Sequence, residues 1–248
     1  SLQKGRMTDY RAQLNDGIRY LVDERRVISG IAVSFGSLAA GEAFARGRIR
    51  EVRLERGAFV PDEADMDERS IFDLASVTKL FTCIAVLQLC ERGKLALDAP
   101  LGSFDKRFIN IADTTIESLL SFRAALRTTA RLDAAASAEE AEKLLFEIRP
   151  APAPKVRFYT DMGAMALKYV VESVSDLSFW EYLQTYILQP LGMRETFAAV
   201  PEALLYRTVC YNYERTVQEG RFCLDAGCPA GTVHDPKARL LSTGLPAP

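Results

Sequence analysis

The residues from Ser76 to about Arg92 form a predominantly apolar stretch of helical length that ends before Gly93. Drawn as a helix, the stretch is apolar on nearly every face, and such helices lie in the interior of a protein. Gly93 fits the position just past a helix end, where a left-handed residue is favoured. The most apolar part, Leu80 to Leu89, is too short to span a bilayer. The sequence therefore predicts a fold built around one buried central helix.

Short apolar segments precede this helix, and helical patterns follow it. Apolar side chains recur at helical spacing in 9–25, and two short strands are predicted at 30–35 and 42–52. The charged, proline-containing stretch 53–69 is predicted to be a loop. Capping signals and periodicity predict the later helices at 114–120, 137–147, 162–175 and from 178 to the proline at 190. A hairpin followed by a run of helices indicates the α+β class.

The start of the central helix carries a candidate nucleophile. Ser76 and Lys79 are three residues apart, so a helix places the hydroxyl and the amine on one face, one turn from each other. A serine needs an adjacent base to become a good nucleophile. The helix N-terminus should favour the alkoxide and lower the pKa of the amine. The alternative is an ordinary helix start with a serine cap and a solvated lysine.

The segment around this pair resembles a known family. Residues 72–82 (Phe-Asp-Leu-Ala-Ser-Val-Thr-Lys-Leu-Phe-Thr), with 85–89 and 91–101 behind them, resemble the first S-x-x-K box of the serine β-lactamase and penicillin-binding-protein-like superfamily. The resemblance is strongest to the branch of class C β-lactamases, D-alanyl-D-alanine carboxypeptidases and related esterases. It implies an antiparallel sheet flanked by helices plus a helical subdomain. It also implies a single domain over 1–248: the N-terminal helix and first strands in 1–70, a mainly helical part with two boxes in 71–200, and a loop-rich, incomplete part in 201–248.

The second box of this family is a Tyr-x-Asn-type motif, and residues 157–164 (Arg-Phe-Tyr-Thr-Asp-Met-Gly-Ala) resemble it after the proline-rich connector 150–154. The resemblance places Tyr159 on the tyrosine, where a phenol relays protons with Lys79 and Ser76. The alternative is a half-buried packing residue. Asp161 falls on the position of the substrate-binding asparagine, and an ionised aspartate cannot donate to an amide carbonyl. This departure favours an esterase-like member, unless Asp161 only caps the following helix.

Two later segments extend the resemblance. Residues 187–197 are similar to the family's I-x-x-P-L-G-M-x-x-T segment, and 231–239 are similar to its V-H-D-x-x-A loop, in which the single histidine, His234, is read as a loop-ordering residue. The third box, a Lys-Thr-Gly or His-x-Gly strand with one oxyanion donor, should follow well after that loop. Ser242-Thr243-Gly244 is interpreted as a coincidence in a loop. The expectation is that the last strands and the terminal helix of the family are missing from 1–248.

Composition excludes some classes of function. The net charge of −2 gives no electrostatic case for nucleic acid or an anionic membrane. Five cysteines without regular spacing argue against a disulfide framework, and Cys210, Cys223, Cys228 and His234 match no common zinc motif. The compartment stays open, between the cytoplasm and export with a signal removed.

The sequence as a whole predicts a serine hydrolase that forms an acyl-enzyme through Ser76, Lys79 and Tyr159, with Asp161 on the substrate side. The substrate is an ester, a β-lactam or an acyl-D-alanine-type compound, small or peptidoglycan-like. This chemistry needs no metal and no organic cofactor. The alternative is an impaired penicillin-binding-like protein that binds peptidoglycan fragments or a partner. The apolar edge of strand 30–35 is predicted to be open to pairing with another chain.

Overall fold

The computed structural model describes residues 2–37, 39–152, 157–209, 213–219, 221–226 and 229–243. The chain divides into two compact units, one made of 1–73 and 199–232, the other of 74–198 and 233–248. The first unit is therefore assembled from two separate stretches of the chain. The three successive parts expected from the sequence stay a prediction.

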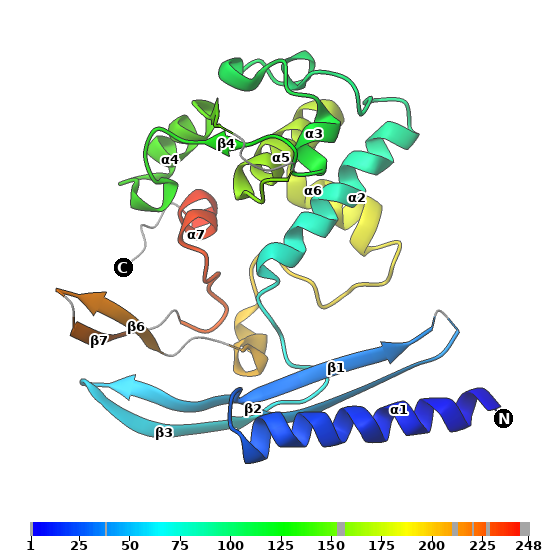
Figure 1. Cartoon of the computed structure of the whole chain (residues 1–248), viewed down its shortest axis with the longest axis vertical. Helices are drawn as coiled ribbons and strands as arrows, with labels where there is room; N and C mark the ends of the chain where they lie inside the picture. The colour runs from blue at the N-terminus through cyan, green and yellow to red at the C-terminus, as the bar shows by residue number, and fades with distance from the viewer. Residues whose placement is uncertain are drawn as a thin grey trace. The chain divides into compact units, whose positions relative to one another are not determined.

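A helix lying along a small antiparallel sheet forms the start of the first unit (Figure 1). Helix α1 (Leu2–Arg19) continues into a π-helical turn at Tyr20–Glu24. The sheet has the order β1 (Gly30–Gly36), β2 (Gly41–Glu55), β3 (Ala58–Asp65). A small core holds helix and sheet together; its members are Ile18, Val22 and Phe44, with Ile31, Val33 and Phe35 packed against them. The predicted helix and two strands are thus confirmed.

Strand β3 corrects the predicted loop at 53–69. Its charges, which had indicated a loop, form cross-strand ion pairs instead: Arg50 Nε lies 3.2 Å from an Asp62 carboxylate oxygen, and Arg48 pairs with Glu63. Pro61 is tolerated because β3 pairs with β2 on one side and lies at the edge of the described sheet. On its other long side β1 has no strand partner among the described residues, so chain pairing there stays a prediction.

The second stretch of the first unit has more regular structure than the sequence predicts. It contains a 3-10 helix at Glu202–Arg207 and the antiparallel pair β6 (Tyr213–Gln218) and β7 (Arg221–Ala226). The buried Arg207 ties this stretch to the end of the first one, because its Nε donates to the Arg69 carbonyl at 2.7 Å.

The second unit is a helical bundle around α2 and α5 (Figure 1). Its helices are α2 (Thr78–Glu91), α3 (Ile116–Leu120), α4 (Ala138–Phe146), α5 (Asp161–Ser175), α6 (Phe179–Leu183), which continues as a π-helical turn at Gln184–Leu188, and α7 (Pro236–Thr243). Single 3-10 turns lie at Ala75–Val77, Leu101–Ser103, Ile109–Ile111 and Leu132–Ala134. The short strands β4 (Leu126–Arg127) and β5 (Arg149–Pro150) pair antiparallel. The predicted mixture of a small antiparallel sheet and helices is confirmed.

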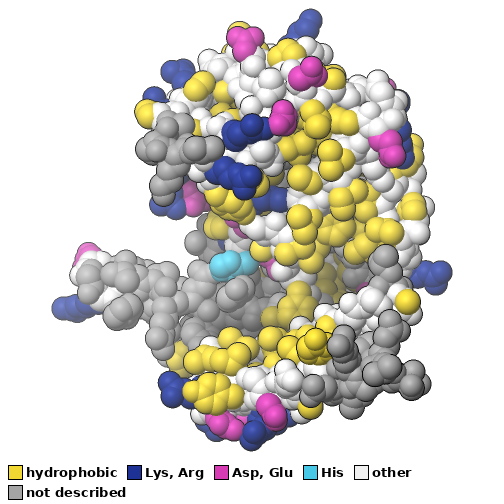
Figure 2. Space-filling view, turned by 45° about the vertical axis from the view of Figure 1, so that its right-hand side comes forward, with side chains coloured by type: hydrophobic (Ala, Val, Ile, Leu, Met, Phe, Trp, Pro, Cys, Tyr) yellow, Lys and Arg dark blue, Asp and Glu magenta, His cyan; other side chains and the backbone are white. Residues whose placement is uncertain are grey.

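Helix α2 is buried on one face only, which corrects the expectation of a helix buried all round. Ala85, Val86 and Leu89 are fully buried in the bundle core, whereas Leu80 is 62% exposed and Leu87 is 49% exposed. Figure 2 shows hydrophobic side chains gathered on the surface of this unit. An apolar sequence cannot by itself decide which face is covered, because both faces carry the same signal.

The predicted helix starts are mostly confirmed. Ser137 and Ser178 cap α4 and α6, and Gly93 has the expected positive φ of 68°. The cap of α3 is Thr115, which accepts from the Ser118 N–H, one residue later than the predicted box at 114–117.

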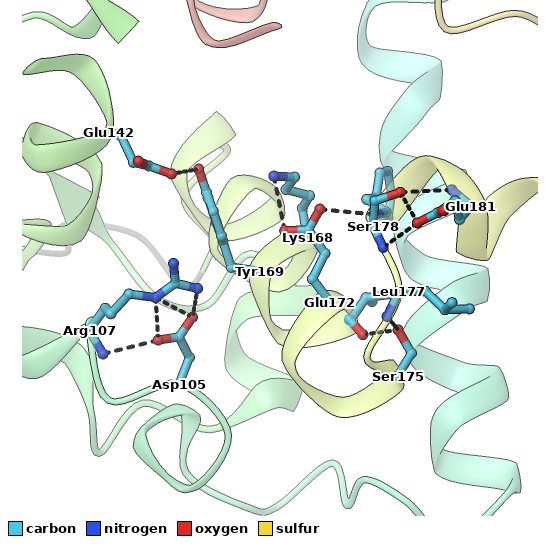
Figure 3. Close-up of polar contacts among 12 residues, drawn as sticks. Asp105, Arg107, Glu142, Lys168, Tyr169, Glu172, Ser175, Leu177, Ser178 and Glu181 are labelled. Atoms are coloured by element: carbon cyan, nitrogen blue, oxygen red, sulfur yellow. Dashed lines mark hydrogen bonds and ion pairs between the residues drawn. The ribbon is translucent and has the colours of Figure 1, made fainter. Parts of the chain in front are cut away.

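Hydrogen bonds join α5 to α6 and to α4, and a cation–π contact joins it to the loop before α3 (Figure 3). The Glu172 carboxylate accepts the Phe179 N–H at 2.9 Å, next to the Ser178–Glu181 capping box. Asp105, whose side chain is 3% exposed, accepts hydrogen bonds from the Arg107 guanidinium on both oxygens, and that guanidinium lies 4.9 Å from the centroid of the Tyr169 ring on α5. The Tyr169 hydroxyl donates to Glu142, and burial together with this bond raises the pKa of Tyr169. These contacts fix α5, whose first turn carries the candidate site.

Candidate active site

Two side chains from different segments of the chain, Lys79 on α2 and Tyr159 just before α5, converge on the Ser76 hydroxyl oxygen. Ser76 lies in the 3-10 turn Ala75–Val77, and Lys79 lies one turn later in α2. Lys79 Nζ donates to Ser76 Oγ at 2.8 Å, and the Tyr159 hydroxyl donates to the same oxygen at 2.9 Å. Ala75, directly before the serine, has a φ of +44°, which is uncommon outside glycine. The predicted convergence of these three side chains is therefore present in the structure.

Phe122 positions the Tyr159 ring. The two rings stack with centroids 5.0 Å apart and planes inclined by 24°. The Phe158 N–H donates to the Phe122 carbonyl at 2.7 Å, which ties the backbone before Tyr159 to the same residue. Phe122 itself has a φ of +56°, an uncommon left-handed conformation. Because Tyr159 is 63% exposed, its hydroxyl is oriented by this stack, by the bond to Ser76 and by the Lys79 ammonium, which lies 5.1 Å from the ring centroid.

Asp161 lies between two lysines. It is the first residue of α5, and its Oδ1 lies 2.7 Å from Lys79 Nζ. Its Oδ2 lies 3.4 Å from Lys237 Nζ. The helix cap is Thr160, whose hydroxyl accepts the Met162 N–H, so the alternative that Asp161 serves only as a cap is wrong. A contact of Asp161 with substrate stays a prediction.

The charges reverse the expected protonation of Lys79. Burial lowers the pKa of Lys79, but hydrogen bonds to Asp161 and Tyr159 and the Asp161 charge together raise it above its ordinary value. The expectation of an amine pKa lowered by the helix N-terminus is therefore wrong, because a carboxylate at 2.7 Å outweighs a helix dipole. The hydrogen bond to Ser76, followed by that to Lys79, lowers the pKa of Tyr159. Of the two candidate bases, the phenol is thus shifted towards deprotonation and the amine away from it.

Lys237 belongs to this cluster and was missed in the sequence. It follows Asp235 and Pro236 at the start of α7, where Asp235 accepts the Ala238 N–H as a cap. Lys237 Nζ lies 2.9 Å from Asp235 Oδ2. The only signal in the sequence was a basic residue behind a capping Asp-Pro pair, which is an ordinary helix start.

Two further predictions concern His234 and the segment 242–244. His234 is half-buried directly before Asp235, and its loop-ordering role stays a prediction. Ser242 and Thr243 lie in the last turn of α7, so their assignment to a loop is wrong, and Gly244 lies outside the described residues.

A shallow depression of about 320 Å³ opens beside Tyr159 and Asp161. It is lined by Thr128, Arg131, Leu132, Asp133, Tyr159, Thr160, Asp161, Met162 and Lys237. Arg131 is paired with Asp133 at 2.6 Å, so every charged group in this wall has an oppositely charged neighbour. Ser76 does not line this depression, but Tyr159, whose hydroxyl donates to Ser76 Oγ, does.

Three findings concern the predictions about metals, thiols and membranes. No group of three or more potential metal ligands occurs among the described residues. Cys83 and Cys90 are half-buried free thiols whose pKa burial raises, while Cys210, Cys228 and the side chain of Cys223 lie outside the described part. Within the described residues, no helix has the length and apolarity that a bilayer crossing requires.

Two curated penicillin-binding proteins are similar in sequence to this chain. The chain is 28% identical over 181 residues to penicillin-binding protein 4 of Amycolatopsis lactamdurans, covering 68% of this chain and 46% of that protein. It is 26% identical over 144 residues to the putative penicillin-binding protein PbpX of Bacillus subtilis (strain 168), covering 58% of this chain and 37% of that protein. The chain thus spans less than half the length of either curated relative.

Solved structures show the same fold. A D-amino acid amidase from Ochrobactrum anthropi SV3 with L-phenylalanine amide matches with a TM-score of 0.67 and 18% identity, covering 94% of this chain and 65% of that one. A class C beta-lactamase matches with a TM-score of 0.64 and 14% identity, covering 92% and 60%. The β-lactamase/transpeptidase-like fold predicted from the sequence is therefore confirmed. The family model described as Beta-lactamase matches residues 42–243, most of the sequence, so this chain belongs to the beta-lactamase family.

Proposed function

We propose that this chain is a serine hydrolase in which Ser76 forms an acyl-enzyme, with Tyr159 moving the protons and the Lys79 ammonium holding the Ser76 oxygen and the phenol in place. The observation that carries the proposal is the pair of hydrogen bonds at 2.8 and 2.9 Å from the amine and the phenol to one serine oxygen. A nucleophile within hydrogen-bond reach of a base, with the base oriented by a further group, is the arrangement that covalent catalysis requires. Here Phe122 and Lys79 orient the phenol.

Tyr159 is the base in this proposal, and Lys79 remains an ammonium. In its phenolate form Tyr159 takes the Ser76 proton as Oγ attacks the substrate carbonyl carbon. The developing oxyanion is held in part by the Ser76 backbone N–H, which lies in the first turn of the helical segment, where N–H groups lack helix partners. Tyr159 then passes the proton to the leaving group. In the second half-reaction it deprotonates a water, which attacks the acyl carbon. Tyr159 then returns that proton to Ser76 Oγ as the C–Oγ bond breaks, which releases the acid product and restores both the serine and the phenolate.

Asp161 supports an ester as the substrate class. A carboxylate already held by Lys79 and Lys237 has no hydrogen to offer a substrate amide. Esters depend less on that bond, because their leaving alkoxide departs more readily than an amine. The proposal therefore ranks simple esters above β-lactams and acyl-D-alanine compounds.

Covalent labelling tests the proposal. The 248-residue chain is treated with a fluorophosphonate, and the modified peptide is identified by mass spectrometry; hydrolysis of p-nitrophenyl esters and of nitrocefin is followed in parallel. We expect the label on Ser76, its loss in Ser76→Ala, and ester turnover above nitrocefin turnover. A label that survives in Ser76→Ala refutes the proposal. A chain that binds peptidoglycan fragments without any labelling would instead support the impaired, binding-only alternative.

A further inference from the structure

Lys237 contacts the candidate site from a different helix and from a distant part of the sequence. Its ammonium faces two carboxylates, Asp235 Oδ2 at 2.9 Å and Asp161 Oδ2 at 3.4 Å. The other oxygen of Asp161 holds Lys79 at 2.7 Å. Four side chains therefore alternate in charge, in the order Lys79, Asp161, Lys237 and Asp235.

We propose that Lys237 is a positioning residue of the site, which holds the second oxygen of Asp161 and so fixes the carboxylate that orients Lys79. This inference rests on the proposed function for its catalytic meaning, but its geometry does not. A carboxylate with one oxygen on each of two ammonium groups cannot rotate without breaking one of the two contacts. The side chain of Lys237 is 22% exposed, which limits the screening of its charge by water.

Lys237 also compensates part of the negative charge of Asp161. Asp161 raises the pKa of Tyr159, whereas Lys79 lowers it. A cation on the far oxygen of Asp161 offsets the first effect, because its charge opposes that of the carboxylate. Without Lys237, the uncompensated carboxylate should make Tyr159 harder to deprotonate.

Other titratable and charged groups lie on the elements around α7. Arg131 precedes the 3-10 turn Leu132–Ala134, which packs on α7, and Asp133 lies within that turn, where the charge of Lys237 lowers its pKa. The remaining groups are Tyr159 before α5, Lys79 on α2, His234 before α7, Arg239 within α7, and Glu139, Glu140, Glu142 and Lys143 on α4, which packs against α7. Arg131 is paired with Asp133 and so does not replace Lys237 at Asp161, while Glu142 accepts the Tyr169 hydroxyl.

The test is the titration of Tyr159 by NMR in protein labelled with ¹³C at the tyrosine ζ carbon. Tyr159→Phe identifies its resonance among the nine tyrosines. We expect Lys237→Met to raise the pKa of Tyr159 by about half a unit, the order expected for one partly screened charge. Lys237→Arg should restore the pKa of the unmodified protein. Asp235→Asn, which keeps a capping side chain, should lower it, because Lys237 then serves Asp161 alone.

Lys168→Met is the matched control. It removes an ammonium that pairs with Glu172 at 3.0 Å on α5, away from Ser76, and should leave the Tyr159 titration unchanged. An unchanged titration in Lys237→Met, or an equal shift in Lys168→Met, overturns the proposal. If Lys237→Met does not fold, the direction of the shift in Asp235→Asn decides, and a rise or no change there overturns it. The titration needs no turnover, so a failure to label Ser76 would refute the proposed function and leave this result standing.

Discussion

Asp161→Asn should turn this site towards amide and β-lactam substrates. The change removes the carboxylate 2.7 Å from Lys79 Nζ and supplies an amide that can donate a hydrogen bond. The side chain of Lys79 is 18% exposed and that of Asp161 is 36% exposed, so the pair is partly screened. Two unit charges 2.7 Å apart interact by about 1.5 kcal/mol in water and by about 6 kcal/mol at an effective dielectric constant of 20.

The lower part of that range applies because of the exposure of Asp161. Loss of this attraction lowers the pKa of Lys79 towards its ordinary value. The new donor to a substrate carbonyl adds about 1 kcal/mol, which is about fivefold in rate. We therefore expect the ratio of β-lactam acylation to ester acylation to rise about fivefold.

The assay compares the rate of labelling by a fluorescent penicillin with the rate of p-nitrophenyl acetate hydrolysis, for the unmodified chain and the variant. Asp176→Asn is the matched control, because Asp176 lies in a left-handed conformation at the other end of α5, which asparagine also adopts. An unchanged ratio in Asp161→Asn, or the same rise in Asp176→Asn, would refute the reasoning.

Three further predictions concern the groups around the site. Burial would raise the pKa of Asp235, but Lys237 and the Ala238 N–H hold it below the ordinary value. The carboxylate should therefore contribute its full stabilisation above about pH 4 and lose it as the pH falls through the lowered pKa. In urea unfolding between about pH 5 and 3, the free energy of unfolding of Asp235→Asn should depend less on pH than that of the unmodified chain. Phe122→Leu should slow fluorophosphonate labelling of Ser76 with little loss of stability, because it removes the stack on Tyr159; a labelling rate equal to that of the unmodified chain would contradict this role. Leu145→Ala, at a fully buried position of α4, should lower the free energy of unfolding by about 2–5 kcal/mol in a urea titration, and a loss below about 1 kcal/mol would show that this core is not closely packed.

The sequence predicts those parts of the fold and site that depend on local patterns. Ser76 and Lys79 meet because three residues make one turn of a helix, and Ser137 and Ser178 cap helices because their signals lie within one turn of them. Tyr159 is far from Ser76 in the chain, and its place was predicted only through the family's second box. Local pattern and family resemblance thus account for three of the convergent groups.

Contacts between distant segments account for what the sequence missed. The charged residues of β3 indicated a loop, because the oppositely charged residues that pair with them lie on β2. The exposed face of α2 could not be identified from the sequence, because both faces of this helix are apolar. Lys237 meets Asp161 only after α7 has packed into the second unit. The pKa of Lys79 likewise depends on a carboxylate from another helix, which outweighs the local helix terminus.

The pH dependence of Ser76 labelling, measured for the unmodified chain and for Tyr159→Phe, tests most directly whether Ser76 is activated by Tyr159. Because Ser76 and Lys79 lower the pKa of Tyr159, the labelling rate of the unmodified chain should rise with pH and level off below the ordinary tyrosine pKa of about 10. Tyr159→Phe should label Ser76 more slowly by about 10²–10⁴-fold and without that rise, as expected for loss of a general base. A Tyr159→Phe variant that labels Ser76 at the rate of the unmodified chain, with the same pH profile, would contradict the account.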